Sequence, residues 1–202
     1  DQVNQALLTG IREMGIDCLP WDRESRQLQA RVNCLRLWRS QQPHETWPDL
    51  SDNELLRDLS WLEPYLAGIN KAEQLKQLNL LEIFNTMLGW NKQQQLNRLA
   101  PTTLAVASGS RIRLRYQHGE PPLLAVRIQE MFGTRHTPVI CDGNIPVLLH
   151  LLSPAQRPLQ VTADLAGSGQ PHAAGRGRQH LPHGAAAGSQ PQRPARQDAA
   201  LQ

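Results

Sequence analysis

The feature that most constrains this chain is an abrupt change of composition at Ser168. From there to Gln202 the sequence contains no Ile, Val, Met, Phe, Tyr, Trp or Lys, and it consists mainly of Ala, Gln, Gly, Pro, His and Arg. A segment with so few large apolar side chains cannot bury enough surface to offset the entropy that it loses on ordering. We therefore expect a folded part that ends near Gly167 and a disordered low-complexity tail over residues 168–202.

The tail also accounts for the net charge. The chain carries 21 Lys and Arg against 18 Asp and Glu, and the four arginines and one aspartate of the tail already give the formal charge of +3. Residues 1–167 are therefore neutral, so the pI of about 9.0 does not indicate a basic nucleic-acid-binding domain. Within the folded part, positive charge is concentrated over residues 98–135, which hold six arginines and two glutamates.

Cysteine usage and hydropathy indicate the class of protein. Three cysteines (Cys18, Cys34 and Cys141) are too few and too scattered for a disulfide framework, so we expect a reducing, cytoplasmic compartment. No apolar run approaches the roughly 20 residues that span a bilayer, and no signal peptide precedes the chain, so we expect no membrane partner. The chain starts without Met, inside an already helical pattern, as expected for a cut within a longer protein.

The first hundred residues predict a bundle of helices, because their apolar residues recur with helical spacing. One face of the first helix carries Val3, Leu7, Ile11 and Met14. Gly15 is expected to end this helix, Asp22 to cap the second, and Ser51 to begin a capping box before the third. An apolar stripe over residues 75–88 and a short polar helix over residues 91–99 complete the bundle.

From residue 101 onward the apolar period changes from about 3.6 to 2. Over residues 111–116 arginines alternate with apolar residues, which is the pattern of a strand with two different faces. Residues 123–132 are expected to form one short helix, because Leu124, Ile128 and Met131 are helically spaced. The second part of the chain is therefore predicted to be mainly β with one helix.

Further along, Asp142-Gly143 signals a hairpin. Its strands are expected over residues 139–141 and 145–152, and a last short strand is expected over residues 159–162. A helical bundle followed by a small, mainly antiparallel β unit makes this an α+β chain.

The arginine-bearing side of the predicted strand is the best candidate for a functional site. Arg111, Arg113 and Arg115 recur about every 6.6 Å, twice the rise of a strand, which is close to the spacing of phosphates in an extended single strand. Each phosphate contact would release a counterion and make binding salt-dependent. Arg127 lies in the same basic region, and Tyr116 ends the strand, where it could stack on a base. A solvated face of a half-buried strand produces the same pattern, and this alternative stays open.

The sequence lacks the motifs that most often carry catalysis. It contains no G-x-x-x-x-G-K-[S/T] loop, no G-x-S-x-G, no H-E-x-x-H and no C-x-x-C. His150 is interpreted as a hydrogen-bonded histidine within an apolar strand, the pair His180 and His183 lies in the tail, and the cysteines have the apolar flanks of core thiols. We expect no catalytic, cofactor-binding or metal-binding residue, which makes a small independent enzyme the least favoured interpretation.

Several longer segments resemble the C-terminal region of bacterial HrpB-type DEAH-box ATP-dependent helicases. The segments that carry the resemblance are residues 27–32, 47–51, 99–101, 108–112, 121–133 and 147–162. The resemblance spans roughly residues 1–167. It implies an α+β fold with an N-terminal helical accessory domain over residues 1–100, followed by a small antiparallel OB-like β-barrel unit with one helix over residues 101–167.

The resemblance also implies a parent protein whose two motor domains bind ATP and Mg²⁺ and translocate on nucleic acid, usually RNA. No motor motif occurs in these residues, so no catalytic residue is carried over and the fragment alone is expected to lack ATPase and unwinding activity. The expected partners are single-stranded RNA or DNA and the motor domains of the parent. The alternative is a protein-docking module without nucleic-acid binding, which would use the apolar face of the first helix.

The tail departs from that family. Family members continue after Gly167 with an aromatic pair and a Lys-containing end, whereas this chain continues with Ser168-Gly169-Gln170. A bias toward Ala, Arg, Gly, Pro, Gln and His is what GC-rich DNA yields when it is read out of frame. We therefore hypothesise a single-nucleotide slip near this point. Reading the gene in the other two frames tests the hypothesis, because one frame should restore the aromatic, Lys-rich end.

Overall fold

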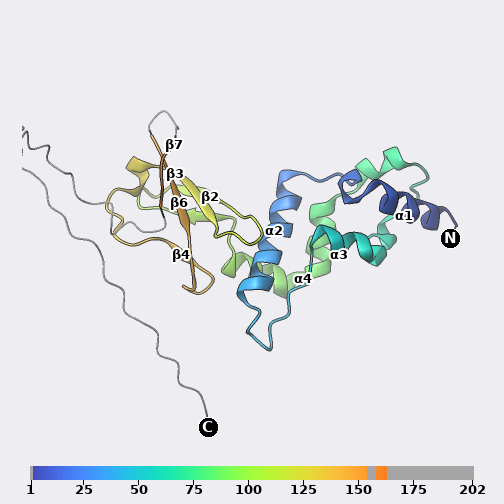
Figure 1. Cartoon of the computed structure of the whole chain (residues 1–202), viewed down its shortest axis with the longest axis horizontal. Helices are drawn as coiled ribbons and strands as arrows, with labels where there is room; N and C mark the ends of the chain where they lie inside the picture. Colours follow the sequence, from blue (N-terminus) through green and yellow to red (C-terminus); the bar gives the residue numbers. More distant parts are fainter. Residues whose placement is uncertain (1, 154–157, 163–202) are drawn as a thin grey trace, which may run out of the picture. The chain divides into compact units, whose positions relative to one another are not determined.

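A computed structural model describes residues 2–153 and 158–162 (Figure 1). The predicted tail and frame slip lie outside the described residues. The α-helices are α1 (Gln2–Met14), α2 (Arg23–Trp38), α3 (Asp52–Arg57) and α4 (Leu80–Leu99). Short 3-10 helices cover Ile16–Cys18, Leu59–Trp61, Glu63–Tyr65, Ala72–Gln77 and Ile128–Met131. In this part of the chain, no helix combines the length and the apolar character that crossing a membrane requires.

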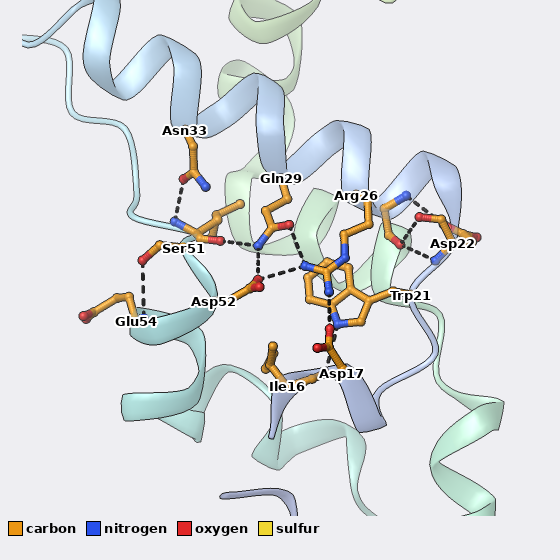
Figure 2. Close-up of polar contacts among 12 residues, drawn as sticks. Ile16, Asp17, Trp21, Asp22, Arg26, Gln29, Asn33, Ser51, Asp52 and Glu54 are labelled. Carbon is orange, nitrogen blue, oxygen red and sulfur yellow. Dashed lines mark hydrogen bonds and ion pairs between the residues drawn. The ribbon is translucent and has the colours of Figure 1, made fainter. Parts of the chain in front are cut away.

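The end of α1 and the start of α2 lie where the sequence indicated. α1 stops before Gly15, whose φ of 87° favours glycine and whose N–H donates to the Ile11 carbonyl at 2.9 Å. At the start of α2, the Asp22 carboxylate accepts from the Ser25 N–H at 2.7 Å, and the Ser25 hydroxyl accepts from the Asp22 N–H at 2.9 Å (Figure 2). This reciprocal pair satisfies backbone groups that a helix start otherwise leaves without partners.

The apolar stripe expected over residues 75–88 is divided between two elements. Residues 72–77 form a 3-10 helix, and α4 starts afresh after Asn79, whose side-chain oxygen accepts from the Glu82 N–H at 3.1 Å. Gly89 (φ 74°, ψ 168°) then interrupts α4. The polar helix expected over residues 91–99 is therefore a separate helical segment that follows this break.

The helical core is mostly aliphatic, with aromatic rings gathered around Phe84. Phe84 is fully buried, and the rings of Trp21 and Trp61 lie 5.5 and 5.4 Å from its ring, centroid to centroid. These tryptophans pack helices together. Trp90, in α4, is different, because 72% of this residue is exposed.

The β part is a five-stranded sheet with the strand order β1-β2-β3-β6-β7. Its strands are β1 (Thr103–Ala105), β2 (Arg111–Arg115), β3 (Leu123–Arg127), β6 (Leu148–Leu152) and β7 (Pro158–Thr162). β3 and β6 run parallel, whereas the other neighbouring pairs are antiparallel. A separate hairpin of β4 (Val139–Ile140) and β5 (Ile145–Pro146) surrounds Asp142-Gly143, as predicted, and β6 then joins the main sheet.

Two expectations about the β part differ from the structure. Residues 123–132 do not form a helix, because residues 123–127 are strand β3 and residues 128–131 are one 3-10 turn. Leu124 and Val126 alternate into the core, and pairing with β2 and β6 outweighs the helical spacing of the sequence. The OB-like barrel is not confirmed, because the sheet formed by the described residues is not closed between β1 and β7. The α+β class and the strand at β2 are confirmed.

α2 joins the helices to the sheet through side chains that bond to backbone groups. The Gln27 amide donates to the Tyr116 carbonyl at 3.1 Å and accepts from the Tyr116 N–H at 2.9 Å. One turn further along α2, the buried Arg31 donates to the Ala100 carbonyl at 2.7 Å and to the Asn97 side chain at 2.9 Å. The Gln27 bonds hold the residue after β2 against α2 and so position the face that carries the arginines, whereas the Arg31 bonds hold the end of α4 against the same helix.

Candidate nucleic-acid interface

β2 presents its arginines to solvent. Arg111, Arg113 and Arg115 are exposed, Ile112 is half-buried and Leu114 is buried. The strand period of two therefore places three guanidinium groups on one side of the sheet, as the alternating sequence indicated.

The fourth predicted cation, Arg127, belongs to the same side of the sheet. β2 and β3 pair with Leu114 opposite Leu124, and both of these residues are buried. Continued along the two strands, this antiparallel register sets the exposed Arg127 opposite Arg111. Two neighbouring strands thus form what we call the arginine face, which consists of Arg111, Arg113, Arg115 and Arg127.

The arginines of this face differ in their internal partners. Arg113 forms an ion pair with Glu24 of α2, and both side chains remain nearly half exposed. The Arg111 guanidinium donates to the Thr103 hydroxyl of β1 at 3.2 Å. The other two arginines form no ion pair with any residue that the structure describes. An external anion can therefore reach these two cations without breaking an internal ion pair.

Tyr116 is not accessible to a nucleobase. It is 3% exposed, its hydroxyl donates to the Pro101 carbonyl at 2.6 Å, and its ring lies 6.4 Å from that of Trp38, centroid to centroid. Burial raises the pKa of this phenol well above its usual value. The stacking role expected from the sequence is therefore corrected, because the alternation that exposes Arg115 turns the next residue toward the core.

One exposed aromatic residue, Phe132, was missed by the sequence analysis. It follows the turn Ile128–Met131 and is 71% exposed. Gly133, with a φ of 86°, redirects the chain directly after it. An aromatic residue followed by glycine was the available signal of an exposed turn, but the helical spacing of the preceding apolar residues obscured it.

A separate polar cluster is centred on Arg26 of α2 (Figure 2). The Arg26 guanidinium lies 2.6 Å from the Asp17 carboxylate and 2.8 Å from the Asp52 carboxylate. It also donates to the Gln29 side chain at 3.0 Å and lies over the Trp21 ring, 3.8 Å from its centroid. The positive charge of Arg26 is thus used inside the protein, where it connects α2 to the start of α3 and to the turn after α1.

A cavity of about 510 Å³ lies beside this cluster. Its lining includes two arginines and two aspartates, Arg26, Arg36, Asp49 and Asp52. Arg36 lies 3.6 Å from Asp49, and Arg26 is paired with Asp52. The charges that line the cavity are therefore compensated internally, unlike those of Arg115 and Arg127.

An apolar groove of about 440 Å³ runs along α1. Its lining includes Val3, Leu7, Met14 and Leu75. Val3 is 43% and Met14 53% exposed, whereas Ile11, which the sequence placed on the same face, is fully buried. The groove is therefore the accessible part of the apolar α1 face that the sequence indicated.

The described histidines and cysteines form no further cluster. Within residues 2–153 and 158–162, no group of three or more His, Cys, Asp or Glu is placed to hold a metal ion. His150 is half-buried in β6, and the pair His180 and His183 lies outside the described residues. All three cysteines are free thiols, and burial raises the pKa of Cys34 to about 11, which keeps it protonated at neutral pH.

Comparison with known proteins identifies relatives of this chain. The family model HrpB_C, described as ATP-dependent helicase C-terminal, matches residues 61–170, a range that ends close to the composition change at Ser168. The ATP-dependent RNA helicase HrpB of Escherichia coli strain K12 is 43% identical over 167 residues. The alignment covers 82% of this chain and 20% of that protein, so the chain spans about a fifth of the length of its relative.

Two crystal structures of E. coli HrpB have a similar fold. One, described as a DExH-box NTPase, has a TM-score of 0.74 and 43% identity, with 81% of this chain and 20% of that chain covered. Another, described as a DEAH/RHA helicase, has a TM-score of 0.71 and 41% identity, with 83% and 21% covered. In both, the matching region is one part of a longer protein.

Proposed function

This chain belongs to the family of HrpB-type ATP-dependent helicases, whose C-terminal region it matches, and we propose that it supplies such a helicase with an accessory contact to nucleic acid. The observation that supports this proposal is the arginine face, where four exposed guanidinium groups share one side of a sheet. The proposed ligand is the sugar-phosphate backbone of single-stranded RNA or DNA.

The chemistry of the face favours backbone contacts over base recognition. Guanidinium groups bind phosphate oxygens through paired hydrogen bonds and keep their charge at every physiological pH. Along β2 they recur about every 6.6 Å, so an extended strand can place consecutive phosphates beside them. Such contacts are independent of base sequence and weaken as salt concentration rises.

ATP hydrolysis belongs, in this proposal, to the rest of the longer helicase. The 202 residues contain no phosphate-binding loop of the G-x-x-x-x-G-K-[S/T] type. ATP and Mg²⁺ would be bound by motor domains outside this chain. We accordingly propose that the chain holds a strand while those domains move it, and that the chain alone turns over no ATP.

The direct test replaces Arg111, Arg113 and Arg115 together by Ala. Binding of a fluorescent single-stranded RNA oligonucleotide is measured by anisotropy over a series of salt concentrations. The slope of log K against log salt is negative, and each lost phosphate contact reduces its magnitude by about 0.7, so in the triple variant the magnitude should be smaller by about 2. Affinity at low salt should fall in parallel by about tenfold or more.

The matched control removes the same charge from another region. Arg12, Arg57 and Lys76 are exposed residues of the helical part, and the variant R12A/R57A/K76A should leave the slope nearly unchanged. Thermal unfolding of both triple variants verifies that they fold. Equal losses in the two variants would show that net charge rather than the arginine face governs binding, and an unchanged slope in R111A/R113A/R115A would contradict the proposal.

A second candidate function is docking on protein, and the apolar groove on α1 supports it. Val3 and Met14 leave apolar surface in solvent beside Leu7 and Leu75, and such surface is typical of a protein interface. The proposed partner is the motor part of the same longer helicase. A chain that binds separately produced motor domains but no RNA would favour this second function.

A further inference from the structure

We propose that Phe132 is a stacking platform for one nucleobase at the end of the arginine face, so that a bound strand lays its phosphates along β2 and one base on the Phe132 ring. This inference rests on the proposed function of the arginine face. It assigns a base contact to a surface that otherwise has only backbone contacts, and it replaces the buried Tyr116 as the aromatic partner.

The exposure of Phe132 is unusual for its chemistry. Aromatic side chains usually bury most of their large apolar surface, but Phe132 is 71% exposed. Its neighbour Met131 is buried and holds the turn in place. The Thr134 N–H donates to the Met131 carbonyl at 3.0 Å, so the backbone is fixed on the other side of Phe132 as well. An anchored turn thus carries a ring that stays in solvent.

The turn lies at a defined end of the arginine face. It begins directly after Arg127, the last residue of β3, and β3 runs antiparallel to β2 with Leu114 opposite Leu124, so Arg127 belongs to the end of β3 that is nearest to Arg111. The Glu130 carbonyl accepts from the Ser108 N–H at 3.2 Å. This bond ties the turn to the loop that leads into Arg111. Both chain connectivity and hydrogen bonding therefore place Phe132 beside the Arg111 and Arg127 end of the two strands.

The residues near Phe132 in the sequence are of the types that bind a single nucleic acid strand. Proteins that bind single strands without sequence preference combine cations for the backbone with aromatic side chains on which bases stack. Phe132 carries no hydrogen-bonding group, so it would accept any base through its π face. Arg127 and Arg135 supply positive charge nearby in the sequence, and Glu130 is the one carboxylate between them.

The experiment separates stacking from charge by using two strands. A fluorescent oligonucleotide with bases is compared with an abasic strand of the same length and the same phosphates. The full chain should bind the strand with bases about tenfold more tightly than the abasic strand. Phe132→Ala should remove this difference and leave abasic binding unchanged, whereas Phe132→Trp should preserve the preference.

The control uses a residue of equal exposure. Trp90 is 72% exposed but belongs to α4 in the helical part, so Trp90→Ala should bind both strands like the unmodified chain. Phe132→Leu keeps an apolar side chain without a ring, and it should behave like Phe132→Ala. If Phe132→Leu kept the preference for bases, a general apolar contact rather than stacking would be at work, which would overturn the proposal.

Two further outcomes would overturn it. In one, Phe132→Ala binds both strands as the unmodified chain does, while R111A/R113A/R115A still flattens the salt dependence. The stacking proposal then fails and the function proposed for the arginine face stands. In the other, Phe132→Ala lowers the affinity for both strands by the same factor, which would show that the ring stabilises the turn rather than stacks on a base. If the chain bound neither strand, the proposed function would fail, and the stacking site with it.

Discussion

The arginines of α2 and the arginines of the sheet have opposite relations to the rest of the molecule. On α2, Arg26 contacts two carboxylates and an aromatic ring, and Arg31 is buried against the end of α4. On the sheet, Arg115 and Arg127 are exposed and form no ion pair with a described residue. A guanidinium that is paired inside the protein holds elements together, whereas the charge of one without an internal ion pair stays accessible to an external anion.

Two arginines of α2 and its C-terminal cap differ from each other in their pKa. A hydrogen bond with Glu45 raises the pKa of Arg39 above its usual value. Desolvation by burial lowers the pKa of Arg31, whose partners are a carbonyl and an amide rather than a carboxylate. Local surroundings, not residue type, therefore decide which arginines serve the fold and which remain available to bind an anion.

The strongest test of this contrast is Arg31→Ala. It leaves the Ala100 carbonyl and the Asn97 side chain without their donor inside the protein and removes buried packing, so the free energy of unfolding should fall by about 2–3 kcal/mol. Arg115→Ala on the arginine face should change it by less than about 0.5 kcal/mol. Urea unfolding measures both values, and equal losses would remove the distinction between the two sets.

A smaller effect is expected at the start of α2. Asp22→Ala should lower the free energy of unfolding by about 1 kcal/mol at neutral pH, because the Ser25 N–H loses its acceptor. The backbone bond from Ser25 lowers the pKa of Asp22 below its unfolded value. The extra stability from the ionised cap is therefore present above the unfolded pKa of about 3.9 and is lost as pH falls through the folded pKa.

Asp22→Asn separates the charge of this cap from its hydrogen bond. Asparagine still accepts from the Ser25 N–H but does not titrate, so the difference in unfolding free energy between the unmodified chain and Asp22→Asn should shrink between about pH 5 and pH 2. A difference that stays constant over this range would show that the ionised carboxylate adds nothing to the cap.

The smallest effect concerns Arg113, which is exposed on the sheet but also has an internal ion pair. Arg113 lies on the arginine face but is paired with Glu24 of α2, so under the proposed function Glu24 would compete with a bound phosphate for it. Glu24→Gln should raise affinity for single-stranded RNA about two- to fivefold, because an exposed ion pair contributes about 1 kcal/mol or less. Glu120→Gln removes the same charge from an exposed turn and serves as the control.

The coupling can be measured directly. Arg113→Ala should reduce RNA affinity less in the unmodified chain than in the Glu24→Gln background, because Glu24 already neutralises Arg113 in the former. Strictly additive effects of the two substitutions would mean that the ion pair does not restrain Arg113.

Local chemistry explains which parts of the fold could be predicted from the sequence. The cap at Asp22, the break at Gly15 and the alternation in β2 each depend on a few neighbouring residues, and all three are confirmed. Residues 123–127 could not be assigned in this way, because their spacing suits a helix. Pairing with β2 and with β6, over 20 residues later, makes them a strand.

The candidate site shows the same limit. Alternation in the sequence was enough to predict that Arg111, Arg113 and Arg115 are exposed. Two contacts with α2 each join residues that are 89 positions apart, namely the pairing of Arg113 with Glu24 and the bond of Tyr116 to Gln27. No local sequence pattern predicts contacts of this kind. Sequence therefore located the cations of the arginine face but not their internal partners.

The double bond between the Gln27 side chain and the Tyr116 backbone limits how this region can change in length over evolution. Because both the N–H and the carbonyl of Tyr116 are held by α2, one residue inserted just before it would shift the pleat of β2 and turn the upstream arginines inward. Residues 107–110 and 118–121 lie in the turns on either side of the strand, where an added residue does not shift the pleat of β2. Insertions and deletions among relatives should accordingly fall in these turns and spare residues 111–116.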